Sequence, residues 1–174
     1  PDTAHPPKVI LSKRNELGIL SNFANTPFVF KGKRFASLEA FWQATKFPEN
    51  QLDERSKLVN WPYSRQEVES MNGYEAKKAG SFASQIMKKN KITWVTFNEK
   101  KMEYRALGKS DFYLLIRKAM REKLAQNSKA RQTLLATGNL TLLPDHHQKS
   151  NVPLAWRYYD IYMEFREMLS SNHK

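Results

Sequence analysis

Residues 20–47 limit the possible folds of this chain more than any other part of its sequence. The stretch begins with a polar loop and continues with two short segments that contain phenylalanine, 28–30 and 34–35, on either side of Lys31-Gly32-Lys33. Such segments around a turn that contains glycine are typical of a β-hairpin. Ser37 then stands where the N-cap of a helix would lie. The segment therefore predicts a loop, a hairpin and a helix in direct succession.

The predicted helix carries an acid, an amide and an amine on one face. Glu39, Gln43 and Lys46 are spaced i, i+4 and i+7, which places them in one row along a helix. On pattern alone, the simpler interpretation is an amphipathic helix whose polar row faces water. The alternative is a site in which a carboxylate and an amine, fixed on rigid backbone, carry out acid–base or covalent chemistry on a small electrophile.

The rest of the chain predicts mostly helices. Capping and periodicity lead us to expect a helix-dominated α+β fold with a small N-terminal β-hairpin or sheet. A single domain is expected over 9–170, with a flexible N-terminal segment at 1–8 and a tail at 171–174. The expected strands are 8–12, 28–30, 34–35 and 139–143; the expected helices are 37–47, 64–71, 74–89, 93–107, 110–126, 128–137 and 154–169, with a loop over 144–153.

Composition narrows the class of protein. The chain has no cysteine, which excludes disulfides, thiolate metal sites and cysteine nucleophiles. It has no apolar run approaching the roughly 18 residues of a membrane-spanning helix, and its first residues lack the apolar core of a signal peptide. We therefore expect a cytoplasmic protein with no membrane partner.

Positive charge is in excess. The 174 residues include 29 basic and 17 acidic side chains, which leaves a net charge of +12. A surplus of this size attracts polyanions, so a nucleic acid or a nucleotide phosphate is the favoured partner, and solvated helix faces are the alternative. Composition does not choose between them.

Other motifs give little evidence of a metal site or of a known catalytic signature. Asp145-His146-His147 is the one tempting metal site, but adjacent histidines rarely converge on one ion, and His5 and His173 lie at the ends of the chain. We expect no metal. The sequence lacks the signatures of serine hydrolases, P-loop proteins and Rossmann folds, so those chemistries are disfavoured.

The sequence resembles the NADAR (YbiA-like) family over about 9–170. The family has an S-N-F loop, a strand pair that ends in a G-K turn, and a helix of pattern S-x-E-x-x-x-Q-A-x-K. Later similarities are weaker: an A-x-x-x-G helix, a tryptophan after it, late helices that run into an L-L-x-T-G turn, and a final helix. The corresponding residues here are Ser21-Asn22-Phe23, Gly32-Lys33, Ser37, Glu39, Gln43, Ala44, Lys46, Ala76–Gly80, Trp94, 116–124, Leu134–Gly138 and 159–166.

Two departures from the family pattern concern the pocket. An extra helical stretch is expected between Trp94 and the late helices, because 102–109 could match the same family segment as 116–123. Many members also carry a W-G-x-G loop after the L-L-x-T-G turn, and this chain has Leu142-Leu143-Pro144-Asp145 there instead. The part of the pocket that this loop supplies is therefore expected to differ.

The resemblance implies an N-glycosidase that needs no cofactor. Some NADAR-like proteins cleave phosphoribosylated riboflavin precursors; others remove ADP-ribose from guanine in DNA, some of them as antitoxins of a DNA ADP-ribosyltransferase toxin. The positive charge and the missing loop favour the second activity, with ADP-ribosylated DNA as substrate and ADP-ribose as product. The riboflavin-precursor activity and a non-catalytic ADP-ribose or nucleic-acid binding module are the alternatives.

The resemblance also suggests roles for individual residues. Glu39 would be the acid–base residue, Lys46 the amine that engages the sugar, and Asp145 a carboxylate that orients a hydroxyl. Lys77, Lys109 and Lys123 are rivals of Lys46. The expected substrate-binding residues are Ser21, Asn22, Phe23, Trp42, Gln43, Trp94 and Lys123.

Overall fold

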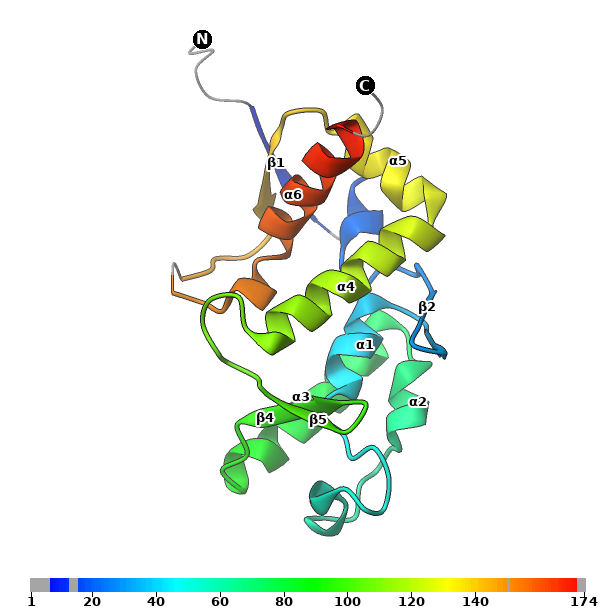
Figure 1. Cartoon of the computed structure of the whole chain (residues 1–174), viewed down its shortest axis with the longest axis vertical. Helices are drawn as coiled ribbons and strands as arrows, with labels where there is room; N and C mark the ends of the chain where they lie inside the picture. The colour runs from blue at the N-terminus through cyan, green and yellow to red at the C-terminus, as the bar shows by residue number, and fades with distance from the viewer. Residues whose placement is uncertain (1–6, 13–15, 150, 172–174) are drawn as a thin grey trace.

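The predicted α+β class is confirmed by a computed structural model, which describes residues 7–12, 16–149 and 151–171 (Figure 1). Within those ranges, helices predominate and the strands form small two-stranded sheets. The elements are β1 (Lys8–Leu11), β2 (Phe28–Phe30), β3 (Lys33–Phe35), α1 (Leu38–Ala44), α2 (Arg65–Glu69), α3 (Gly73–Lys89), β4 (Trp94–Phe97), β5 (Lys100–Glu103), α4 (Asp111–Gln126), α5 (Ser128–Ala136), β6 (Thr141–Pro144) and α6 (Tyr158–Ser171), with 3-10 turns at Gly18–Leu20, Glu54–Lys57 and Leu154–Trp156. No helix in these ranges is both long and apolar enough to cross a membrane.

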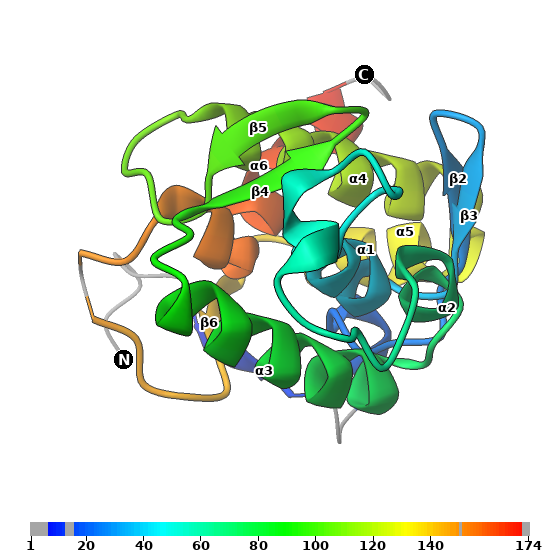
Figure 2. The ribbon, with the colours of Figure 1, turned by 90° about the horizontal axis from the view of Figure 1, so that it is seen from below.

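Helix α1 lies in the middle of the molecule. It packs against α2, α3 and α4, and the view from below shows α3 on one side of it and the β4–β5 hairpin on the opposite side (Figure 2). Its apolar side joins an aromatic cluster in which the ring centroid of Phe41 lies 4.8 Å from that of Phe35 and 5.5 Å from that of Phe97. Such contacts fix the position of α1 against both hairpins.

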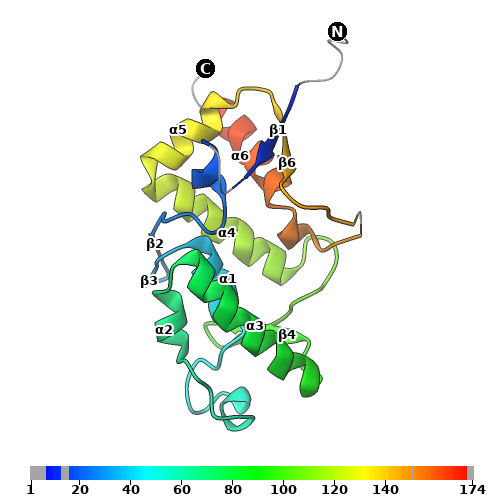
Figure 3. The ribbon, with the colours of Figure 1, turned by 180° about the vertical axis from the view of Figure 1, so that it is seen from behind.

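A strand near the N-terminus pairs in parallel with a strand from the last third of the chain. Lys8 pairs with Thr141 and Leu11 with Pro144, so β1 and β6 run side by side under α6 (Figure 3). The predicted strands at 8–12 and 139–143 are confirmed with small shifts. Because Pro144 ends β6, this pairing also fixes where the segment from Asp145 onward leaves the sheet.

The prediction of a helix at 93–107 is wrong. This segment forms the antiparallel hairpin β4–β5, which turns at Asn98 and Glu99 with φ of 48° and 67°. Val95 and Met102 point into the core. Aromatic and β-branched residues followed by a left-handed turn favour a hairpin, so the extra stretch after Trp94 is a hairpin followed by an irregular segment of turns and bends. The predicted helix at 154–169 likewise begins later, at Tyr158, after a 3-10 turn.

Two buried arginines fasten the β4–β5 hairpin to the segment that follows α1. Arg55 is fully buried and donates to Thr45 O, Asp53 and Thr96 Oγ1. Arg65 donates to Phe47 O and Thr96 O at 3.0 Å. Burial, followed by the nearby Arg55, lowers the pKa of Arg65 to about 10, so Arg65 stays charged at neutral pH. These side chains satisfy backbone carbonyls that no regular element would pair.

We predict that Arg65→Met destabilises the fold by about 3–5 kcal/mol, because several buried acceptors lose their donor and Glu49 loses its partner. Urea denaturation gives the free energy of unfolding. Arg34→Met, which removes an exposed arginine of β3, is the matched control and should change it by less than about 0.5 kcal/mol. Equal effects from the two variants would contradict a structural role for the buried network.

Candidate active site

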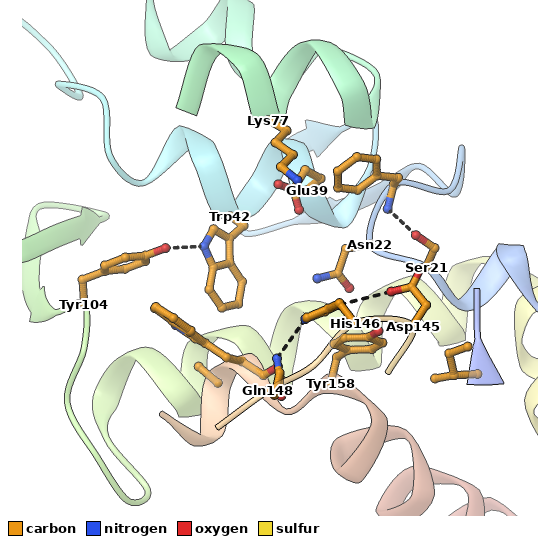
Figure 4. Close-up of a pocket in the computed structure, with 14 residues that line it drawn as sticks. Ser21, Asn22, Glu39, Trp42, Lys77, Tyr104, Asp145, His146, Gln148 and Tyr158 are labelled. Carbon is orange, nitrogen blue, oxygen red and sulfur yellow. Dashed lines mark hydrogen bonds and ion pairs between the residues drawn. The ribbon is translucent and has the colours of Figure 1, made fainter. Parts of the chain in front are cut away.

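A cavity of about 450 Å³ opens beside the N-terminal half of α1 (Figure 4). Its volume lies within the range of roughly 300–1,000 Å³ that is usual for small-molecule sites. Its walls come from the loop after the first 3-10 turn, from α1 and α3, and from the segments after β5 and β6. The lining residues are Leu11, Ser21, Asn22, Phe23, Glu39, Trp42, Lys77, Tyr104, Asp145, His146, Gln148, Ala155, Trp156 and Tyr158.

Glu39 is a buried carboxylate held in one orientation. Ser37 caps α1 by accepting the Ala40 N–H at 3.0 Å, and the Glu39 N–H donates to Asn22 O at 2.9 Å. Gln43 Nε2 donates to Glu39 Oε1 at 2.7 Å. The side chain is only 7% exposed, and that exposed part faces the cavity. A carboxylate fixed in this way is preorganised to accept a proton or to stabilise a developing positive charge.

The interpretation of a polar row facing water is wrong. Glu39, Gln43 and Lys46 are all less than 9% exposed, because α3 covers this face of α1. The close approach depends on Gly80: a Cβ built there would lie 1.8 Å from Gln43 Oε1. Gly80 therefore leaves the space that Gln43 needs to reach Glu39.

Lys46 lies behind the cavity wall rather than in it. Its Nζ donates to Ser84 Oγ at 2.9 Å and lies 4.9 Å from the centre of the Tyr104 ring. Burial lowers the pKa of Lys46 to about 8, against the attraction of Glu39, which raises it, and with Arg105 lowering it further. By ordinary titration, about a tenth of such amines are neutral at pH 7.

Lys77 is the lysine that lines the cavity. It extends from α3, and in Figure 4 its amine points toward the Glu39 carboxylate. Its Nζ also lies 5.6 Å from the centre of the Phe23 ring. Unlike Lys46, Lys77 is exposed, so it can meet a substrate phosphate or hydroxyl directly.

The loop of Ser21 and Asn22 is fastened from below by Lys123. Lys123 is fully buried, and its Nζ donates to Ser21 O at 2.9 Å. Burial lowers the pKa of Lys123 to about 7. Asn22 lines the cavity, and its buried Oδ1 has no hydrogen-bond partner. Lys123 thus supports the loop without lining the cavity.

Aromatic side chains form the wall between α1 and the late loops. Trp42 Nε1 donates to the Tyr104 hydroxyl at 3.0 Å. The Tyr104 ring lies 5.8 Å from the ring of Trp156, whose Nε1 has no partner. Burial, followed by the charge of Asp145, raises the pKa of Tyr158 to about 12. This wall offers flat apolar surface and a polar edge to a base or a sugar.

The segment after β6 closes the far side of the cavity. Asp145 Oδ1 lies 3.1 Å from His146 Nδ1, and Gln148 Nε2 donates to Trp156 O at 3.0 Å. Among the described residues, no group of three or more histidine or acidic side chains is placed to hold a metal ion; His5 and His173 lie outside them. Asp145, which the sequence analysis selected, and His146 face the cavity from the side opposite Glu39 (Figure 4).

The structure brings some of the predicted site residues together and separates others. Ser21, Asn22, Phe23, Glu39, Trp42 and Asp145 line the cavity, whereas Gln43, Lys46 and Lys123 support it from behind. Trp94 lies elsewhere, with Arg55 Cζ 4.8 Å and Lys101 Nζ 4.2 Å from its ring, and Lys109 is exposed outside the cavity lining. Sequence analysis did not select the cavity residues Leu11, Tyr104, His146, Gln148, Ala155, Trp156 and Tyr158.

Comparisons with known proteins agree with this architecture. A family model described as "Bacteriophage protein GP30.3" matches residues 15–153. The NMR structure of the Escherichia coli protein YbiA superimposes with a TM-score of 0.61 at 23% sequence identity, covering 97% of this chain and 88% of that one. No curated protein matches the sequence. The predicted resemblance to YbiA-like proteins is therefore confirmed in the fold.

We predict that Gly80→Ala destabilises the protein by about 1–3 kcal/mol, because the added methyl group overlaps Gln43. A loss of stability would be informative, because replacing glycine by alanine inside a helix normally stabilises it by about 1 kcal/mol. Thermal or urea unfolding measures it, with Ser81→Ala on the exposed side of α3 as the control.

A double-mutant cycle tests the cause. Gly80→Ala combined with Gln43→Ala should cost less than the sum of the single changes by about 0.5 kcal/mol or more, because the overlap is removed. Additive costs would show that the close approach at Gly80 does not act through Gln43.

Proposed function

The chain belongs to the bacteriophage protein GP30.3 family, and we propose that it is an N-glycosidase that removes ADP-ribose from guanine bases in DNA. The observation that carries the proposal is the buried Glu39 carboxylate, held by Gln43 at the wall of a cavity lined with polar and aromatic side chains. The YbiA-like fold also supports the proposal. The activity was expected from a sequence resemblance to YbiA-like N-glycosidases, and the fold is of that type.

The proposed reaction replaces a carbon–nitrogen bond with a carbon–oxygen bond. Water attacks the anomeric carbon of the ribose while the bond to the guanine nitrogen breaks, through a transition state of oxocarbenium character. Glu39 takes the proton from the attacking water, whose hydroxyl stays on the anomeric carbon, and the departing guanine nitrogen gains that proton from Glu39. Asn22 and Asp145 would hold ribose hydroxyls, and Lys77, which points toward Glu39, would hold a phosphate.

A second route uses an amine in place of water. A neutral lysine attacks the opened ribose at its anomeric carbon, guanine leaves, and water later releases the sugar from the resulting Schiff base. We propose Lys46 as this amine: burial lowers its pKa to about 8, and its side chain would have to leave Ser84 to reach the sugar from behind the cavity wall. Lys77 is its rival, since it lines the cavity directly.

Charge favours a polyanionic substrate over a small one. The net charge of +12 is large for a domain of this size and attracts a DNA strand more strongly than a riboflavin precursor. Removal of phosphoribosyl groups from such precursors is the alternative activity. A binding module without turnover is the alternative from another class. An antitoxin role beside a DNA-modifying toxin remains a prediction from the resemblance.

We predict that Glu39→Gln lowers the release of ADP-ribose from a guanine-modified DNA oligonucleotide by about 10²–10⁴-fold, because the amide cannot accept the proton. Single-turnover assays followed by chromatography measure the release. Glu167→Gln, an exposed acid-to-amide change on α6, is the matched control and should release ADP-ribose at the wild-type rate.

The outcomes separate the candidate functions. Release that persists in Glu39→Gln would remove Glu39 from the chemistry. If the wild type releases nothing from DNA but cleaves a phosphoribosylated riboflavin precursor, the small-molecule activity replaces the proposal. If it binds ADP-ribose without cleaving either substrate, the protein is a binding module.

We further predict that borohydride traps substrate on the wild-type protein and that Lys46→Ala abolishes the trapping, because the Schiff base then cannot form. Mass spectrometry of the reduced adduct locates the modified lysine. Loss of trapping in Lys77→Ala, with trapping unchanged in Lys46→Ala, would transfer the role to Lys77. Turnover with no adduct in any variant would favour direct attack by water.

A further inference from the structure

A second cavity, of about 680 Å³, lies next to the candidate active site. It is formed by the C-terminal half of α3 and by the segment that follows β5. Tyr104 lines both cavities and is the residue that their linings share. The proposed reaction in the first cavity leaves this second space without a role.

Further contacts link the two cavities. The Arg105 guanidinium, at the edge of the second cavity, lies 4.8 Å from the centre of the Trp156 ring, which lines the first. Ser84, in the wall of the second cavity, accepts the hydrogen bond from the Lys46 amine. A ligand that spans Tyr104 would therefore contact both cavities.

The lining of the second cavity suits a nucleotide. Met87 and Ile92 give it an apolar floor, and Tyr104 adds an aromatic face, on which a base can pack. Lys88 and Arg105 supply positive charge at its rim, against the single carboxylate of Glu103. Apolar surface for a base beside cations for a phosphate is the combination used by proteins that hold single strands.

We propose that the second cavity holds the nucleotide next to the modified guanine, so that the protein recognises a DNA strand rather than an isolated nucleoside. The inference rests on the proposed function and specifies its substrate class. The strand passes over Tyr104: the ADP-ribosylated guanine enters the first cavity, and the neighbouring base lies on Met87 and Ile92 with its phosphate near Lys88 and Arg105.

The test compares two substrates at low salt: ADP-ribosylated guanosine and a single-stranded oligonucleotide with the same modified base. The wild type should prefer the oligonucleotide, measured as the ratio of the two kcat/KM values. Lys88→Ala together with Arg105→Ala should lower that ratio by roughly tenfold or more and flatten its salt dependence, because phosphate contacts are lost. Lys118→Ala together with Arg121→Ala removes the same charge from exposed positions of α4 and should leave the ratio unchanged.

Three results would overturn the proposal. An unchanged ratio in Lys88→Ala/Arg105→Ala means that the second cavity does not touch the strand. Equal losses with both substrates mean that it holds part of the ADP-ribose instead. A ratio that falls as far in the α4 control variant means that the preference comes from overall charge.

A binding measurement separates this proposal from the proposed function. If the wild type cleaves neither substrate, the glycosidase proposal fails. Fluorescence anisotropy with an unmodified single-stranded oligonucleotide then tests separately whether the second cavity binds a nucleotide. Binding about tenfold weaker in Lys88→Ala/Arg105→Ala than in the α4 control variant would support a nucleotide site. Equal binding by the two variants would overturn it.

Discussion

The contact between α1 and α3 at Gly80 is the constraint on which the candidate site depends. Without a side chain at Gly80, α3 comes close enough to cover the polar face of α1, and Gln43 has room to hold Glu39. The same approach buries Lys46 next to Ser84. Because position 80 has no side chain, the polar row of α1 is buried. The Glu39 carboxylate is then held in one orientation, and the pKa of the Lys46 amine is lowered.

Much of the fold could be predicted because its signals are local. Ser37, Ser64 and Ser110 each cap the helix expected after them, by hydrogen bonds within three residues along the chain. The β4–β5 hairpin was missed because the residues at 93–107 also fit a helical period, and its conformation depends on the left-handed turn at Asn98 and on burial of Val95. Packing decided what periodicity left open.

The candidate site was less predictable because distant segments build it. The resemblance pointed to the loop of Ser21 and to Glu39, and both line the cavity. Trp94 was selected because the family has a tryptophan after its A-x-x-x-G helix, yet here the ring of Trp94 lies against Arg55 and Lys101. Tyr104 was not selected, because sequence analysis placed it in a helix, although it lines both cavities. No pattern in the sequence shows that Lys123 would be buried under Ser21, since that contact joins residues far apart in the chain.

The parallel pairing of β1 with β6 has a consequence for how the protein is made. During synthesis Lys8 leaves the ribosome before its partner Thr141, with α1 to α5 between them. Until Thr141 follows, β1 has no strand beside it, and the segment of Asp145 and His146 is not yet fixed opposite Glu39. Contacts between residues so distant in sequence form slowly in folding, so we expect the wall opposite Glu39 to form after the local contacts of α1. The cavity around Glu39 is therefore complete only once β6 has been made and has paired with β1.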